Sequence, residues 1–181
     1  MSLWLMVTVA AAPVAASYLT YYFWPPARTV NYGALIEPRP LPDPRLALAD
    51  GTPFQLSRLR GKWVLVSVDS GGCDARCERK LLYMRQLRLT QGKDMDRVER
   101  AWLISDDAPL RSDALAPYRG TWLVRAADTG LLDAFPAPEA ASDHIYVIDP
   151  LGNLMMRFPR DPEPGRMIKD LTRLLKASRV G

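Results

Sequence analysis

The sequence predicts an α/β domain, a mixed sheet flanked by helices, preceded by one N-terminal transmembrane helix. Three observations support this fold class. The composition, 48% hydrophobic and 24% charged, is that of a folded protein. Residues 3–24 form an apolar run, and from residue 46 onward β-rich runs alternate with amphipathic segments. A chain of 181 residues has room for one ordinary domain and an appendage.

Residues 3–24 contain no Asp, Glu, Lys, Arg or His. As a helix this run is about 33 Å long, enough to cross a bilayer core of about 30 Å. Tyr21, Tyr22 and Trp24 are typical of an interfacial aromatic belt. A cleaved signal peptide is the alternative, but the run is long, has no basic segment before it and ends in bulky aromatics. We therefore expect residues 1–24 to be an uncleaved anchor.

Residues 25–45 contain six prolines. This density predicts a Pro-rich linker, an extended and semi-rigid spacer between the anchor and a domain at residues 46–181. An ordered arm packed along that domain is the alternative for part of the segment.

The domain predicted at residues 46–181 alternates strands and helices. The expected strands are 63–68, 101–105, 121–124, 145–148 and 154–158, and the expected helices are 74–91, 111–118 and 163–178. Residues 149–153 predict the turn of a hairpin between the last two strands. This order of elements is that of a thioredoxin-like mixed sheet.

The chain has only two cysteines, Cys73 and Cys77, and both lie where the first buried strand gives way to a helix. The i, i+4 spacing places both sulfurs on one helical face, and a helix N-terminus favours thiolate over thiol. Two such thiolates can close a redox-active disulfide or hold one Cu(I) ion. Ordinary buried thiols or a structural bridge are the alternatives. Zinc is disfavoured because it needs four ligands and the chain has one histidine.

That histidine, His144, comes directly before the strand expected at 145–148. A lone histidine at such a position is usually a packing or surface residue. In the predicted topology, however, its loop faces the start of the cysteine helix. Two thiolates and one imidazole would then converge, a set able to hold Cu(I) and also Cu(II).

The sequence resembles the Sco/SenC family of membrane-anchored, thioredoxin-like, copper-binding proteins over about residues 46–178. The resemblance rests on the Cys-x-x-x-Cys pair at Cys73 and Cys77, the acidic loop at residues 106–109, and Asp143-His144 ahead of the turn at residues 149–152. It implies a role in assembling the copper centre of cytochrome c oxidase, and Cys73, Cys77 and His144 as copper ligands.

The sequence departs from the family pattern at four places. In one of them, residues 69–72 replace the aromatic-Gly-Tyr-like segment that leads into the cysteines. Asp74 and Glu78 stand where the family usually has a proline after each cysteine, and His144 lies two residues before Tyr146 rather than about five. An odd shift within a strand reverses the side to which a residue points. The orientation of His144 is therefore the most sensitive element of the predicted site.

The sequence is consistent with three functions. The favoured one is a copper-binding assembly factor, a chaperone rather than an enzyme, whose partner is the oxidase subunit that carries a copper centre. The second is a thiol–disulfide oxidoreductase, and the third is a non-enzymatic interaction module tethered to the membrane. The small net charge of +4, with basic residues spread among acidic ones, excludes a nucleic-acid-binding protein.

We expect a single-pass protein of the inner membrane with a periplasmic domain, because cysteines that form disulfides or handle copper favour the periplasmic side. The three arginines after the anchor, Arg28, Arg39 and Arg45, favour the opposite orientation.

Overall fold

The structure is a computed structural model that describes residues 3–23, 31–110, 119–178 and 180. It divides into two compact units, Met1–Val30 and Asn31–Gly181. The first contains the helix α1, Leu3–Phe23, with Pro13 inside it. By length and composition, α1 could cross a membrane from Trp4 to Phe23, which agrees with the predicted anchor.

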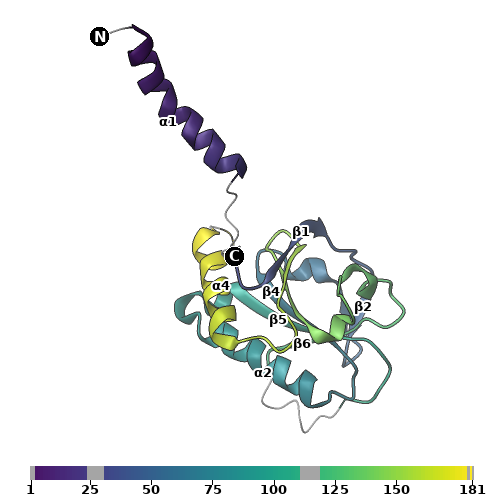
Figure 1. Cartoon of the computed structure of the whole chain (residues 1–181). Coiled ribbons are helices and arrows are strands. Elements are labelled where there is room, and N and C mark those ends of the chain that lie inside the picture. Colours follow the sequence, from purple (N-terminus) through teal and green to yellow (C-terminus); the bar gives the residue numbers. More distant parts are fainter. Residues whose placement is uncertain (1–2, 24–30, 111–118, 179, 181) are drawn as a thin grey trace. The chain divides into compact units, whose positions relative to one another are not determined.

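The second unit is built on one eight-stranded mixed sheet, in the order β1-β8-β7-β4-β5-β6-β2-β3 (Figure 1). Strands β4, β5 and β6 are parallel, whereas β7 pairs with β4 and β8 in antiparallel fashion. The strands are β1 Ala34–Pro40, β2 Leu46–Leu48, β3 Pro53–Phe54, β4 Trp63–Asp69, β5 Val98–Ile104, β6 Trp122–Arg125, β7 Ile145–Ile148 and β8 Asn153–Arg157. The helices are α2 Ala75–Leu89 and α4 Pro164–Ala177, with 3-10 turns η1 Leu56–Leu59, η2 Gly92–Arg97, η4 Leu132–Ala134 and η5 Ala141–Asp143.

The central strand β4 is buried along its whole length. Because side chains alternate along a strand, Trp63 and Leu65 face one hydrophobic cluster while Val64, Val66 and Val68 face another. Helices α2 and α4 pack against each other and cover the first cluster (Figure 1). Short segments around η1 and η4 cover the second. The predicted thioredoxin-like fold class is thus confirmed, while the helix expected near 111–118 lies outside the described residues.

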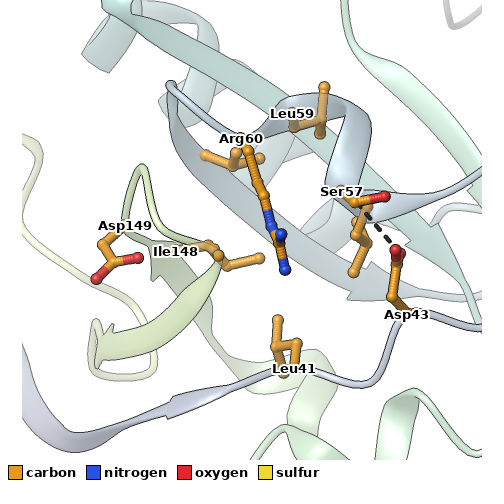
Figure 2. A pocket seen from close by; sticks show the side chains of 10 residues that line it. Leu41, Asp43, Ser57, Leu59, Arg60, Ile148 and Asp149 are labelled. Carbon is orange, nitrogen blue, oxygen red and sulfur yellow. Dashed lines mark hydrogen bonds between the residues drawn. The ribbon is translucent and has the colours of Figure 1, made fainter. Parts of the chain in front are cut away.

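The predicted spacer differs from what the structure shows at its C-terminal end. Residues 34–40 form β1, which pairs with β8 at the edge of the sheet. Proline lacks an amide donor, and an edge strand tolerates this because one of its sides needs no partner. Farther along, Leu41 and Asp43 line a largely apolar hollow beside η1, into which the Arg60 guanidinium points (Figure 2). The compact unit accordingly begins at Asn31 rather than at residue 46.

A buried carboxylate on α4 holds the beginning of this arm. Asp170 is 1% exposed, and it accepts hydrogen bonds from the backbone amides of Tyr32 and Gly33, at 2.7 and 2.8 Å. These bonds join residues that are more than 130 positions apart in the chain. The arm is therefore part of the folded unit.

Replacing Asp170 tests this attachment. We expect Asp170→Ala to lower the free energy of unfolding by about 3 kcal/mol, because two amides lose a charged acceptor. Urea unfolding of residues 31–181, followed by tryptophan fluorescence, measures the change. The exposed neighbour Lys169→Ala is the control and should change stability by no more than about 0.5 kcal/mol. Equal effects of the two substitutions would contradict the assigned role of Asp170.

Candidate functional site

The two cysteines lie together at the carboxyl end of β4. Cys73 follows the turn after the strand, and Cys77 lies in the first turn of α2. They form a disulfide with their Cα atoms 5.1 Å apart. Cys73 is 4% exposed and Cys77 1%, and both belong to the hydrophobic cluster under α2 and α4. The predicted pair is thus assembled, and Cys73 is the more accessible of the two sulfur-bearing residues.

The turn that carries Cys73 is held by the loop after β5. A Cβ atom on Gly71 would lie only 2.3 Å from the carbonyl oxygen of Ala108, so no larger residue fits there without displacement. The Asp106 carboxylate accepts hydrogen bonds from the amides of Gly71 and Ala108, at 2.8 and 3.1 Å. Hydrogen bonds from Ser70 and then from Gly71 hold the pKa of Asp106 below its ordinary value. Cys73 itself has a φ of 38°, a left-handed conformation that is uncommon outside glycine.

Asp74 caps the amino end of α2, at a position where the sequence departs from the Sco/SenC pattern. Its carboxylate accepts from the amides of Cys77, at 2.9 Å, and Arg76, at 3.0 Å. These two bonds, the one from Cys77 first, hold the pKa of Asp74 below its ordinary value. The capping charge compensates helix amides that would otherwise favour a cysteine thiolate. Asp74 therefore weakens the stabilisation that the helix N-terminus was expected to give that thiolate.

A buried ion pair lies beside the cysteines. Lys80 on α2 and Asp69 at the end of β4 are 2.7 Å apart between Nζ and Oδ2, and both side chains are almost fully buried. Ser67 donates to Asp69, while Lys80 also donates to the carbonyl oxygens of Ser142 and, at 3.5 Å, Val68. Burial raises the pKa of Asp69 and lowers that of Lys80, and the attraction between the two charges opposes both shifts. Desolvation thus shifts the pKa values of the two groups toward each other.

The loop that precedes β7 is attached to the start of α2 by charged contacts. Arg76 Nη1 lies 2.5 Å from the buried carboxylate of Asp143, and Arg160 Nε lies 3.5 Å from the same oxygen. The bond from Lys80 to Ser142 adds a second link. The loop that carries His144 is thus packed against the helix that carries Cys77, as the predicted topology required.

His144 is buried, and its Nδ1 lies 2.8 Å from the carbonyl oxygen of Phe158. Since a carbonyl only accepts hydrogen bonds, Nδ1 carries the proton. Burial lowers the pKa of His144, which favours the neutral ring with its lone pair on Nε2. Among the described residues, no three His, Cys, Asp or Glu side chains are grouped so as to hold a metal ion. The structure thus brings Cys73 and Cys77 together but does not group His144 with them while the disulfide is closed.

Sequence reasoning missed the buried charges of this site, Asp69, Lys80 and Asp143. One signal could have found Lys80. The residues of α2 that are buried include Cys77, Lys80, Leu81 and Met84, a spacing of three and four that marks one helical face. A lysine in that stripe has to be buried, and a buried lysine requires an acidic partner.

The fold and the cysteine pair define a thioredoxin-like protein. Residues 63–178 match the family model described as a transmembrane-like, thioredoxin-like C-terminal domain. Because the match covers more than half of the chain, the protein belongs to this family. The comparison with curated protein sequences gave no match.

Solved structures of similar fold include several Sco proteins. Copper-bound ScoI of Bradyrhizobium japonicum shares 19% identity over 75% of this chain and 99% of its own, with a TM-score of 0.59. Yeast Sco1 with copper bound shares 14% identity over 79% of this chain and 96% of its own, with a TM-score of 0.65. A putative protein disulfide isomerase from Bacteroides thetaiotaomicron shares 19% over 81% and 95%, with a TM-score of 0.55. The predicted resemblance to Sco/SenC proteins is confirmed at the level of the fold.

Two glycines in the cysteine turn provide a matched test of how that turn is held. We expect Gly71→Ala to lower the free energy of unfolding by about 2 kcal/mol, because the added methyl group meets the Ala108 carbonyl. The control is Gly72→Ala, whose added Cβ would lie 3.6 Å from Ser70 Oγ, an ordinary contact. Urea unfolding of residues 31–181 in the disulfide form measures both. A Gly72→Ala effect as large as that of Gly71→Ala would contradict the close packing.

Proposed function

We propose that the protein is a membrane-anchored copper-binding assembly factor that matures the copper centre of cytochrome c oxidase. The observation that carries the proposal is the pairing of Cys73 and Cys77 at the start of α2. Reduction of this disulfide by two electrons and two protons gives two thiols one helical turn apart. As thiolates they form a soft pair suited to Cu(I). The fold similarity to copper-bound Sco proteins supports the same chemistry.

His144 is the proposed third ligand. Its Nδ1 is engaged by the Phe158 carbonyl, which fixes the ring orientation and leaves Nε2 as the ligating atom. Its loop is held to α2 through Asp143 and Arg76. Opening of the disulfide removes the covalent bond between the two sulfurs, and the proposal requires that the thiolates and Nε2 then converge.

The proposed partner is the oxidase subunit that carries a copper centre, and the proposed location is the inner membrane with the domain on the periplasmic side. Helix α1, which is long and apolar enough to cross a membrane, supports a single anchor. A disulfide between the only two cysteines of the chain supports an oxidising compartment.

A copper titration tests this function. We expect reduced residues 31–181 to bind one Cu(I) per chain under anaerobic conditions, measured by competition with a chromogenic chelator. Cys73→Ser and Cys77→Ser should abolish binding because one thiolate is lost, and His144→Ala should weaken it by about tenfold or more.

Gln86→Ala, at an exposed position farther along α2, is the control and should bind as the wild type does. Failure of the reduced wild type to take up copper would disprove the proposal. Unchanged uptake by His144→Ala would remove His144 from the ligand set and leave the cysteines in place.

A thiol–disulfide oxidoreductase is the second candidate, and the buried pair of Asp69 and Lys80 favours it. Such a pair can accept and return the proton that a thiol loses on forming a thiolate. In this mechanism the Cys73 thiolate attacks a partner disulfide and one partner sulfur leaves as a thiolate. Cys77 then attacks Cys73 in the mixed disulfide, which releases the reduced partner and closes the Cys73–Cys77 bond.

Trapping separates the two candidates. For the oxidoreductase, Cys77→Ser should accumulate a mixed disulfide between Cys73 and its partner, seen as a reductant-sensitive band on non-reducing gels. Cys73→Ser should not, because Cys77 is the less exposed sulfur. Full activity of a Cys73→Ser, Cys77→Ser double variant in cells would contradict both candidates.

A further inference from the structure

A cavity lined by arginines lies at the opposite end of the sheet from the cysteines. It has a volume of about 410 Å³, within the range of small-molecule sites. Its arginines come from three segments: Arg88 from the last turn of α2, Arg100 from the start of β5, and Arg119 from the segment before β6. Cys77 lies eleven residues before Arg88 on α2, about 16 Å along the helix axis. The cavity is therefore separate from the cysteine site.

Arg100 is the unusual member of this group. It is only 4% exposed, and its Nη2 donates to the carbonyl oxygen of Arg119 at 2.9 Å. Its Nε and Nη1 have no hydrogen-bond partner within the described part of the chain, and neither does the buried hydroxyl of Thr121. Buried N–H groups of a guanidinium are normally satisfied because desolvating them is costly. Three unsatisfied polar atoms thus belong to residues that line one cavity.

The charges around the cavity are mostly positive. Burial is the main cause that lowers the pKa of Arg100, and Arg88 and Arg85 add to the shift while Glu99 opposes it. The two nearby carboxylates are already engaged. Asp96 lies 3.1 Å from Arg88 Nη2, and Glu99 accepts a hydrogen bond from the Trp122 indole at 3.1 Å. The donors of Arg100 that have no partner among the described residues are therefore available to an acceptor bound in the cavity.

Gly120 keeps the cavity wall close to the guanidinium. Its φ is +82°, a conformation that side chains rarely adopt, and a Cβ atom there would lie 3.3 Å from Arg100 Nη2. The backbone at residues 119–121 can therefore run close to Arg100, as the bond to the Arg119 carbonyl requires.

We propose that this cavity binds a phosphate group, either free or as the monoester of a small molecule. A tetrahedral anion offers at least three acceptor oxygens, which match donors from Arg100 on β5 and from Arg119 and Thr121 on the segment before β6. Guanidinium groups bind phosphate through paired, charge-assisted hydrogen bonds. A lipid headgroup and a soluble compound can both present this group, so the chemistry is common to two sources.

The test uses the full chain in dodecyl maltoside, a detergent without phosphate. Inorganic phosphate is titrated by calorimetry and by thermal unfolding, at an ionic strength kept constant with sodium chloride. We expect saturable binding and a rise in Tm of about 2–5 °C at saturation. Dihexanoyl phosphatidic acid is titrated in parallel. Binding of phosphate alone indicates that the natural ligand is a soluble compound. Tighter binding of the lipid, with phosphate as a competitor, indicates that the ligand is a lipid headgroup. If neither phosphate nor the lipid binds, the proposal is wrong.

Two variants and one control make the assignment specific. Arg119→Gln should weaken phosphate binding about tenfold, because a lining donor is lost. Arg85→Gln removes the same charge from an exposed residue of α2 that does not line the cavity, and should change the affinity less than threefold. Equal losses in the two variants would reveal a general charge effect and overturn the site.

Arg100→Met separates ligand binding from structural support. Removal of a buried, incompletely satisfied charge should keep or raise the Tm without phosphate and abolish the phosphate-dependent rise. A lower Tm together with a retained phosphate response would overturn the role of Arg100.

Discussion

The burial of β4 on both faces is the constraint from which the rest of the domain follows. Trp63 and Leu65 pack under α2 and α4, while Val64, Val66 and Val68 pack into the opposite cluster. A slip of one residue would exchange these two sets and place Asp69 on the wrong face. The register of β4 therefore fixes where the strand ends, which side the terminal carboxylate takes and where the cysteine turn begins.

The carboxylate of Asp69, at the carboxyl end of β4, explains why polar side chains are buried near the cysteines. By the same alternation, Ser67 and Asp69 point toward the helices, and Lys80 meets Asp69 there. Desolvation makes such a pair expensive, and replacing a buried pair with apolar residues often stabilises a protein. Its cost is offset by the apolar clusters on both sides of β4. Lys80 lies one helical turn beyond Cys77, which is the position that the proposed oxidoreductase mechanism requires of the pair.

The sequence predicted the elements with strong periodicity and missed those whose character depends on distant partners. The runs at 63–68 and 74–91 predicted β4 and α2 because their patterns are local. Strand β1 corresponds to the alternative of an ordered arm; the extended spacer was favoured because of its prolines, which only the edge position beside β8 makes acceptable. The burial of Lys80 and Arg100 was missed because charged side chains are usually exposed. The orientation of His144 could not be predicted, since it depends on the turn η5 and on a carbonyl of Phe158.

Helix α2 relates the two sites that the domain presents. Its first turn carries Cys77 and Asp74, and its last turn carries Arg88. The cysteines follow the carboxyl end of β4, and Arg100 lies near the amino end of β5. Because these two strands run parallel, the two sites lie at opposite ends of the strands. Occupation of one site therefore need not obstruct the other, and an anion at the arginines could act on the cysteines through α2 or through β4, whose Leu65 pairs with Arg100. Both elements are packed into the same apolar cluster as the disulfide, so such coupling would require a shift of packed side chains rather than a direct electrostatic contact.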